Sequence, residues 1–155
     1  MKKIRIQDVD NRLGPGKERR WLSDELGAED VSVNYYVLEP GESFGYGLHK
    51  HENQEEVFYI QSGTATFETE EGETEVEEGE VVRFAPGEYQ LGKNEGDENV
   101  VALAMGAPRE MGETEILREC DDCGERTVQE LEMTDERDAI LTKCTDCGSE
   151  TGRFD

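Results

Sequence analysis

The chain has 155 residues, and its 39 acidic against 16 basic side chains give a formal net charge of -23. Phosphate backbones and anionic lipids repel such a surface, so the composition argues against a nucleic-acid-binding protein and against a membrane-surface protein. No apolar stretch is long enough to span a bilayer, and no apolar signal core follows the basic N-terminus, so we expect a cytoplasmic protein.

The acidity has two interpretations. Only 34% of the residues are hydrophobic, and this value together with high charge is typical of disordered chains. Here, however, the apolar residues recur in short blocks separated by Gly, Pro and acidic turns, which indicates a folded β protein. The excess acid then lies on the surface, as in proteins from high-salt cytoplasms, where screening weakens like-charge repulsion. We therefore expect a halophilic protein.

In chain order, the sequence predicts one short helix and a series of short strands. We interpret the locally basic residues 12–20 as a solvated loop, with an anion-binding flap over a pocket as the alternative. Residues 21–28 are the candidate helix. Strands are expected at residues 31–38, 56–60, 64–69, 81–84, 100–105, 127–133 and 139–143, with turns rich in Gly, Pro and Glu between them. This pattern predicts an all-β barrel or sandwich.

A linker at residues 109–112 divides the chain into two expected domains, residues 1–110 and 111–155. The first has 11 basic and 25 acidic residues, and the second has 5 and 14, so their net charges are -14 and -9. Neither part contains a basic domain.

All four cysteines lie in the second part, in two copies of one motif. Cys120 and Cys123 are followed by Gly, as are Cys144 and Cys147, and twenty residues separate the two pairs. Two such turns supply four sulfurs to one tetrahedral ion, which is typical of a zinc ribbon with a structural zinc ion. The alternatives are two disulfides, which need an oxidising compartment, or a redox dithiol, which needs no second copy. Such a ribbon is an inert tail or a docking site for a protein partner, and its negative charge disfavours nucleic acid.

The two histidines of the chain are His49 and His51, and in a strand this spacing places both rings on one face. Glu56 follows after a polar turn. Two imidazoles and a carboxylate can occupy one triangular face of Fe(II), Mn(II) or a similar ion and leave positions for water or substrate. The alternative is a pair of surface histidines in a polar loop.

These residues, with Gly63 after them, resemble the first motif of the cupin superfamily, and residues 79–94 resemble the second. The resemblance implies a cupin-type jelly-roll β-barrel in front of the zinc ribbon, and a divalent metal (Fe, Mn, Ni or Zn) bound by His49, His51 and Glu56. Gln90 stands where the family has its fourth ligand, a histidine, and Ser43 stands where the first motif has an opening glycine. The Gln90 carbonyl is a weaker ligand than imidazole, so it binds the metal, bonds to a metal-bound water, or marks a barrel without metal.

If the barrel closes as in the cupins, its substrate pocket is expected to contain Phe58, Phe84 and Tyr35, with Ile60 and Met105 as further candidates. Tyr46, in a Gly-Tyr-Gly loop beside His49, is the expected mobile contact.

Three functions follow from this resemblance. The first is a small-molecule metalloenzyme, dioxygenase-like or isomerase-like, in which Glu56 is the catalytic proton acceptor. The alternative is a non-catalytic small-ligand-binding or regulatory module whose ribbon docks a partner. The third is a barrel that serves only as a dimerisation scaffold, since the resemblance implies a homodimer.

Overall fold

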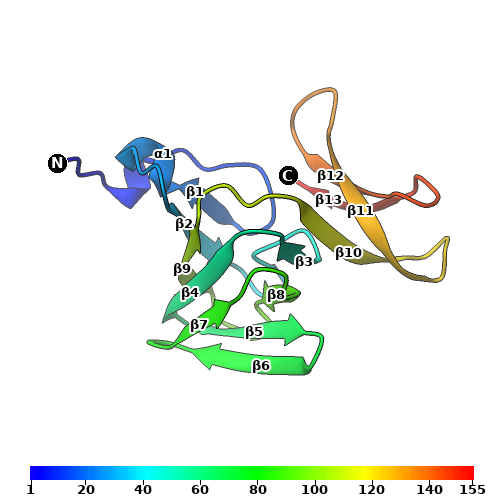
Figure 1. Ribbon diagram of the computed structural model, residues 1–155, viewed down its shortest axis with the longest axis horizontal. Helices are drawn as coiled ribbons and strands as arrows, with labels where there is room; N and C mark the ends of the chain where they lie inside the picture. The colour runs from blue at the N-terminus through cyan, green and yellow to red at the C-terminus, as the bar shows by residue number, and fades with distance from the viewer.

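The computed structural model of the protein describes residues 1–155, and Figure 1 shows a molecule built almost entirely of strands. A 3-10 helix η1 (Ile6–Asp8) and one α-helix α1 (Leu22–Leu26) are its helical elements. The strands are β1 (Glu18–Trp21), β2 (Ser32–Leu38), β3 (Leu48–His51), β4 (Glu55–Ser62), β5 (Thr64–Thr69), β6 (Gly72–Glu77), β7 (Val81–Phe84), β8 (Gln90–Lys93), β9 (Val100–Ala107), β10 (Thr114–Cys120), β11 (Glu125–Met133), β12 (Ile140–Cys144) and β13 (Glu150–Phe154). The prediction of an all-β protein is confirmed.

The helix is shorter than the sequence suggested. Gly27 adopts a left-handed conformation with φ of 69°, and its N–H donates to the Asp24 carbonyl, which ends α1 after Leu26. No helix of the protein combines the length and the apolar character that crossing a membrane requires.

The strands form two antiparallel sheets. A five-stranded sheet has the order β1-β2-β9-β4-β7, and an eight-stranded sheet has the order β13-β12-β11-β10-β3-β8-β5-β6. The central strand β9 alternates between buried and partly exposed residues, as a strand covered on one face requires. Val100 and Ala102 are fully buried on its inner face.

Aromatic side chains fill the space between the sheets. Phe58 of β4 lies 5.1 Å from Phe67 of β5, measured between ring centroids, and Phe67 lies 5.3 Å from Phe84 of β7. Phe44 packs on Phe58 at 5.2 Å. Tilted pairs of this kind add about 0.5–1.5 kcal/mol each to the burial of their area, so this cluster fixes the distance between the two layers.

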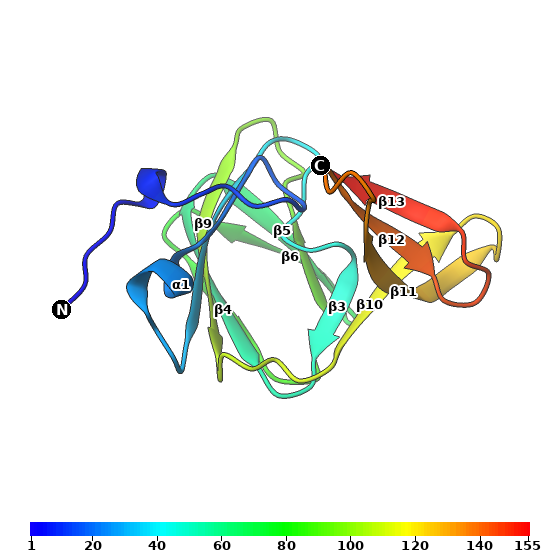
Figure 2. The ribbon, with the colours of Figure 1, turned by 90° about the horizontal axis from the view of Figure 1, so that it is seen from above.

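The cysteine-containing strands continue the barrel sheet. β10 pairs with β3 in antiparallel register, with Thr114 opposite His51 and Ile116 opposite His49. β11, β12 and β13 then add to β10 in turn, and Figure 2 shows them beside the barrel. The division into residues 1–110 and 111–155 falls in the segment between β9 and β10 and stays a prediction, but the two parts share one sheet.

Candidate metal centre and ligand cavity

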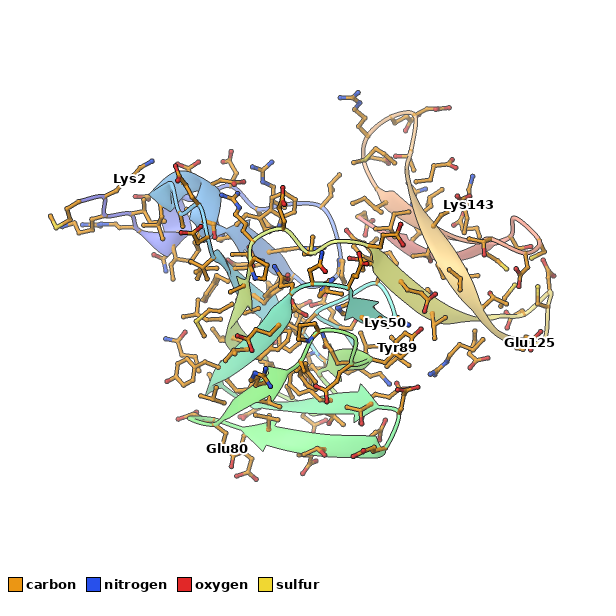
Figure 3. The ribbon with its side chains drawn as sticks, in the orientation of Figure 1. Lys2, Lys50, Glu80, Tyr89, Glu125 and Lys143 are labelled. Carbon is orange, nitrogen blue, oxygen red and sulfur yellow. The ribbon has the colours of Figure 1, made fainter.

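Alternation along β3 separates the candidate ligands from their neighbour Lys50. His51 is buried and His49 partly buried on the inner side. Lys50 lies on the outer side, where its Nζ is 4.5 Å from the Tyr89 ring centroid and 3.1 Å from a Glu115 carboxylate oxygen. Figure 3 shows Lys50 and Tyr89 next to each other beside β3. The His-x-His spacing therefore does place both rings on one face.

Three elements bring the candidate ligands together. Glu56 on β4 approaches from the opposite sheet, and its Oε2 lies 3.3 Å from His51 Nε2 and 3.8 Å from His49 Nε2. Gln90 on β8 stands opposite His49 in the sheet, and its side-chain nitrogen lies 2.6 Å from Glu56 Oε2 and 3.0 Å from His49 Nε2. The ligand atoms of both histidines and Glu56 all lie within 4.8 Å of one another.

Both imidazole rings are oriented by their other nitrogen. His49 Nδ1 lies 2.9 Å from the Gly47 carbonyl, which can only accept, so Nδ1 donates a proton to it and Nε2 faces Glu56. His51 Nδ1 lies 2.8 Å from the Thr114 hydroxyl of β10. A Cβ on Gly45 would come within 2.7 Å of the His49 ring, so glycine is needed there for this ring position. Partners of this kind fix the tautomer of metal-binding histidines.

Gln90 provides a direct test of whether a metal ion fits. Its side chain is buried, and its Oε1 has no hydrogen-bond partner, which is costly for a buried oxygen. A 180° turn of the amide exchanges the two ends and directs Oε1 at Glu56 and His49, which is unfavourable without a cation and favourable with one. The residues present therefore fit a divalent metal with His49, His51, Glu56 and Gln90 around it.

Glu56 has the charge that such a site needs. Burial by itself raises the pKa of this carboxyl, but the hydrogen-bonding histidines His49 and His51 outweigh it and lower the pKa to about 2. The side chain is therefore a carboxylate at neutral pH, ready to accept a cation.

A cavity of about 710 Å³ opens above this centre. His49, His51, Glu56 and Phe58 lie on its wall, and β10 and β11 contribute another wall through Thr114, Ile116, Gln129 and Leu131. Cavities of about 300–1,000 Å³ are typical of small-molecule sites. The expected pocket residue Tyr46 also lines it.

Two of the expected pocket residues are corrected. Tyr36, not Tyr35, lines the cavity, because β2 buries Tyr36 and Leu38 toward the core and leaves Tyr35 only partly buried. Phe84 belongs to the aromatic core and borders a crevice on the other side of Glu56 that is too small for a ligand. Of the further candidates, Ile60 is fully buried in the core, and Met105 does not line the cavity.

Arg19 is the main residue that sequence reasoning missed. The stretch 12–20, interpreted as a solvated loop, contains the first residues of β1, and Arg19 on this strand lines the cavity. Its Nη1 donates a hydrogen bond to the Tyr46 hydroxyl at 3.0 Å. The signal in the sequence was the local excess of arginine, but the inward direction of one side chain depends on the pairing of β1 with β2.

The C-terminal strands also hold the loop that carries Tyr46. The Arg118 guanidinium of β10 donates to the Tyr46 carbonyl and, at 3.1 Å, to the Thr151 carbonyl of β13. Phe154 packs edge-on against the Tyr46 ring, with 5.1 Å between the centroids. The four-cysteine part of the chain is therefore a structural wall of the ligand cavity.

The four cysteines meet at the far end of these strands. Their sulfurs all lie within 4.8 Å of one another, with 3.5 Å between Cys120 and Cys147 and 3.8 Å between Cys123 and Cys144. Four sulfurs bound tetrahedrally to zinc at about 2.3 Å lie about 3.8 Å apart, so this spacing fits zinc. Gly124 and Gly148 follow the two pairs with φ of 72° and 79°, and each donates its N–H to the carbonyl of the first cysteine in its pair, at 2.8 Å.

Neighbouring groups prepare these sulfurs unequally. The hydroxyl of Thr127 donates to Cys144 Sγ at 3.1 Å and, with backbone N–H groups, lowers the pKa of this thiol to about 6. Hydrogen bonds with the Cys147 and Cys120 side chains raise the pKa of Cys123. A dication at the centre would favour the thiolate form of all four.

Comparison with known proteins agrees with this architecture. Residues 34–106 match the family described as "Cupin domain", and none of the curated proteins matches the chain. A sugar phosphate isomerase of the cupin superfamily from Silicibacter pomeroyi has a similar structure (TM-score 0.62, 18% identity, 97% of this chain and 92% of that chain covered). The polyketide cyclase RemF from Streptomyces resistomycificus is also similar (TM-score 0.64, 22% identity, 79% of this chain and 89% of that chain covered). A predicted oxalate decarboxylase from Thermotoga maritima is similar as well (TM-score 0.60, 23% identity, 69% of this chain and 99% of that chain covered).

At these identities the structural likeness concerns the fold alone. It nevertheless extends in the first of these proteins over nearly the whole chain, and so over most of the C-terminal strands. The expected resemblance and the jelly-roll class are confirmed: residues 34–106 match the cupin domain, and the chain has the fold of these cupin structures.

Proposed function

We propose that this protein is a metal-dependent enzyme that acts on a small molecule in the cavity above His49, His51 and Glu56. The observation that carries the proposal is the convergence of two imidazole rings and one carboxylate, whose ligand atoms lie within 4.8 Å of one another, at the wall of a cavity of about 710 Å³. The cavity lies between the two sheets and reaches solvent, so that a substrate could meet all three side chains at once.

A bound divalent metal would polarise a substrate oxygen as a Lewis acid or act as a redox centre. The residues of the chain supply the rest. His49 and His51 keep their orientation through Gly47 and Thr114. Glu56 is ionised, and once it leaves the metal it can accept a proton from a substrate carbon or oxygen. Phe58 and Ile116 exclude water from one side of the cavity.

A non-catalytic ligand-binding module is the second candidate, and one observation favours it. Gln90 Nε2 donates to Glu56 and lies against His49, which stabilises the three side chains without a metal. In that case the barrel would bind a ligand through its cavity alone, and the C-terminal strands would contact a partner.

Metal content of the double variant His49→Ala/His51→Ala tests the metal centre. We expect the wild-type protein to contain about two metal ions per chain and the variant about one, the zinc of the four cysteines. Metal-depleted protein should regain the second ion from Fe(II), Mn(II), Ni(II) or Zn(II), as measured by elemental analysis after dialysis. Equal metal content in the wild type and the variant would show that the barrel does not bind a metal.

Turnover is then measured with the reloaded protein. The panel comprises oxygen consumption with thiols, diketones and phenols, isomerisation of sugar phosphates, and release of carbon dioxide from oxalate. Glu55→Gln is the matched control, because Glu55 precedes Glu56 and pairs with Arg83 outside the cavity. We expect the control to behave as wild type and Glu56→Gln to lose turnover by about 100-fold or more. Metal binding without any turnover would favour the second candidate.

A further inference from the structure

The charged side chains of the cavity are unequally neutralised. Arg109 forms an ion pair with Asp24 and donates to the Ala28 carbonyl at 2.6 Å, so its charge is compensated. Glu56 faces the two histidines. Arg19 has no carboxylate within ion-pair distance, although the chain has 39 acidic residues.

Side chains alternate between the two faces of β1, so two consecutive arginines differ in whether their charge is paired. Arg20, on the outer side, pairs with Glu18 at 2.9 Å. The Arg19 guanidinium, on the inner side, makes one hydrogen bond, from Nη1 to the neutral Tyr46 hydroxyl, and its Nε is buried without any partner. Its guanidinium carbon lies 5.2 Å from the Tyr46 ring centroid and 5.8 Å from that of Tyr36.

A partly buried guanidinium is most stable when its charge and its N–H groups are matched, and Arg19 is partly buried. Aromatic faces supply part of this stabilisation, but they accept no strong hydrogen bond. The unmatched charge lies on the wall of the same cavity as His49, His51 and Glu56. We propose that Arg19 binds the oxyanion group of an anionic small-molecule ligand, a phosphate or a carboxylate, whose other end reaches the His49-His51-Glu56 centre.

The chemistry of the guanidinium selects this ligand class. Its planar fork of N–H donors matches carboxylate and phosphate oxygens. An anion bound to Arg19 would neutralise the unpaired positive charge. A volume of about 710 Å³ accommodates a ligand of the size of a sugar phosphate or a sugar acid. Tyr46 bonds to Arg19, and its loop is held by Arg118 and Phe154, so the C-terminal strands position the anion site. This inference deepens the proposed function and rests on the same cavity.

Three matched probes test it: glucose 6-phosphate, gluconate and glucose, titrated calorimetrically into the full-length protein at constant ionic strength. We expect at least one of the two anions to bind more tightly than neutral glucose, and the stronger of them identifies phosphate or carboxylate as the preferred group. Arg19→Gln should lower the affinity for that anion by about ten- to hundredfold and leave the affinity for glucose unchanged. Arg19→Lys should restore part of the affinity, because lysine keeps the charge without the fork.

Arg20→Gln is the control, since Arg20 pairs with Glu18 on the outer side of β1, does not line the cavity and should change no affinity when replaced. Circular dichroism melting checks that Arg19→Gln is folded. Anion affinity that survives Arg19→Gln in the folded variant overturns the inference, as does equal or absent binding of all three probes to the wild type.

Metal analysis of the wild type beside the His49→Ala/His51→Ala variant shows whether the barrel holds a metal, and this separates the inference from the proposed function. If the wild type takes up no barrel metal but binds the anion through Arg19, the anion site is supported and the proposed metalloenzyme is rejected. If the wild type binds a barrel metal but its anion affinity does not depend on Arg19, the metal centre is supported and the anion site is rejected.

Discussion

Gln90 is the residue at which this chain departs from the ligand set of the family it resembles. Its amide lies between Glu56 and His49, in the place of a fourth ligand, and its buried oxygen is unpaired. An amide oxygen is a neutral and weaker donor to a metal than an imidazole nitrogen. The barrel should therefore bind its ion with three strong ligands and one weak one.

Replacement of Gln90 should change metal affinity in a direction set by the new side chain. We expect Gln90→His to bind Mn(II) or Zn(II) in the barrel about tenfold more tightly than wild type, and Gln90→Leu about tenfold more weakly. Competition against a chromophoric chelator measures both. Gln61→His is the control, because Gln61 is exposed on the same sheet as Glu56 but far along β4. Unchanged affinity in all three variants would show that Gln90 is not a ligand.

Among the secondary-structure elements, β10 links the two candidate metal sites. Its first residue, Thr114, orients His51, and its last, Cys120, belongs to the four-sulfur cluster. Between them, Ile116 lines the cavity and Arg118 holds the Tyr46 loop. Loss of order at the cysteine end of β10 would therefore reach the cavity through a single strand.

If the four cysteines hold a zinc ion, its removal should loosen the C-terminal strands and the cavity wall together. A structural zinc contributes on the order of 10 kcal/mol to the folding of a small module, so Cys123→Ser/Cys147→Ser should lose both the metal and the order of β10 to β13. Hydrogen exchange should show faster exchange of amides in β10 and in the Tyr46 loop, while β4 and β9 remain protected.

Ser149→Ala is the matched control for this variant. Ser149 contacts Cys147 Sγ at 3.3 Å but is not a metal ligand of the expected type, so this variant should keep the zinc and the wild-type exchange rates. Protected β10 amides in the metal-free cysteine variant would contradict the structural role of the zinc.

Over the whole molecule, net charge is the dominant electrostatic property. The hairpin of β5 and β6 illustrates it, because Glu75 and Glu77 are exposed on one face of β6 without an ion-pair partner, whereas Glu73 and Glu68, opposite each other, share Lys93. Like charges this close destabilise the folded state, and added salt screens them. The acidic surface thus predicts a protein that is most stable in concentrated salt.

Thermal unfolding measured against potassium chloride tests this expectation. We expect Tm to rise by about 5 °C or more between dilute buffer and molar salt, which corresponds to roughly 1–2 kcal/mol for a chain of this size. Glu75→Gln/Glu77→Gln should raise Tm in dilute buffer and reduce the gain from salt, because it removes two exposed charges from β6. A Tm that does not change with salt in the wild type would exclude a halophilic adaptation.

The sequence by itself determined the features that depend on short spacing. His49 and His51 share a face because strand side chains alternate, and each cysteine pair faces one ion because a glycine allows the turn behind it. The apolar blocks and turns likewise predicted most strands to within two residues, including β5 at 64–69 and β7 at 81–84.

Only the tertiary structure decided which side chains surround the cavity. Tyr36 rather than Tyr35 faces inward because β2 pairs with both β1 and β9 in a fixed register, and a shift by one residue would exchange the two. Arg19 enters the cavity and Thr114 reaches His51 through pairings with strands distant in the chain. These contacts depend on which strands become neighbours, and the local pattern of polar and apolar residues does not contain that information.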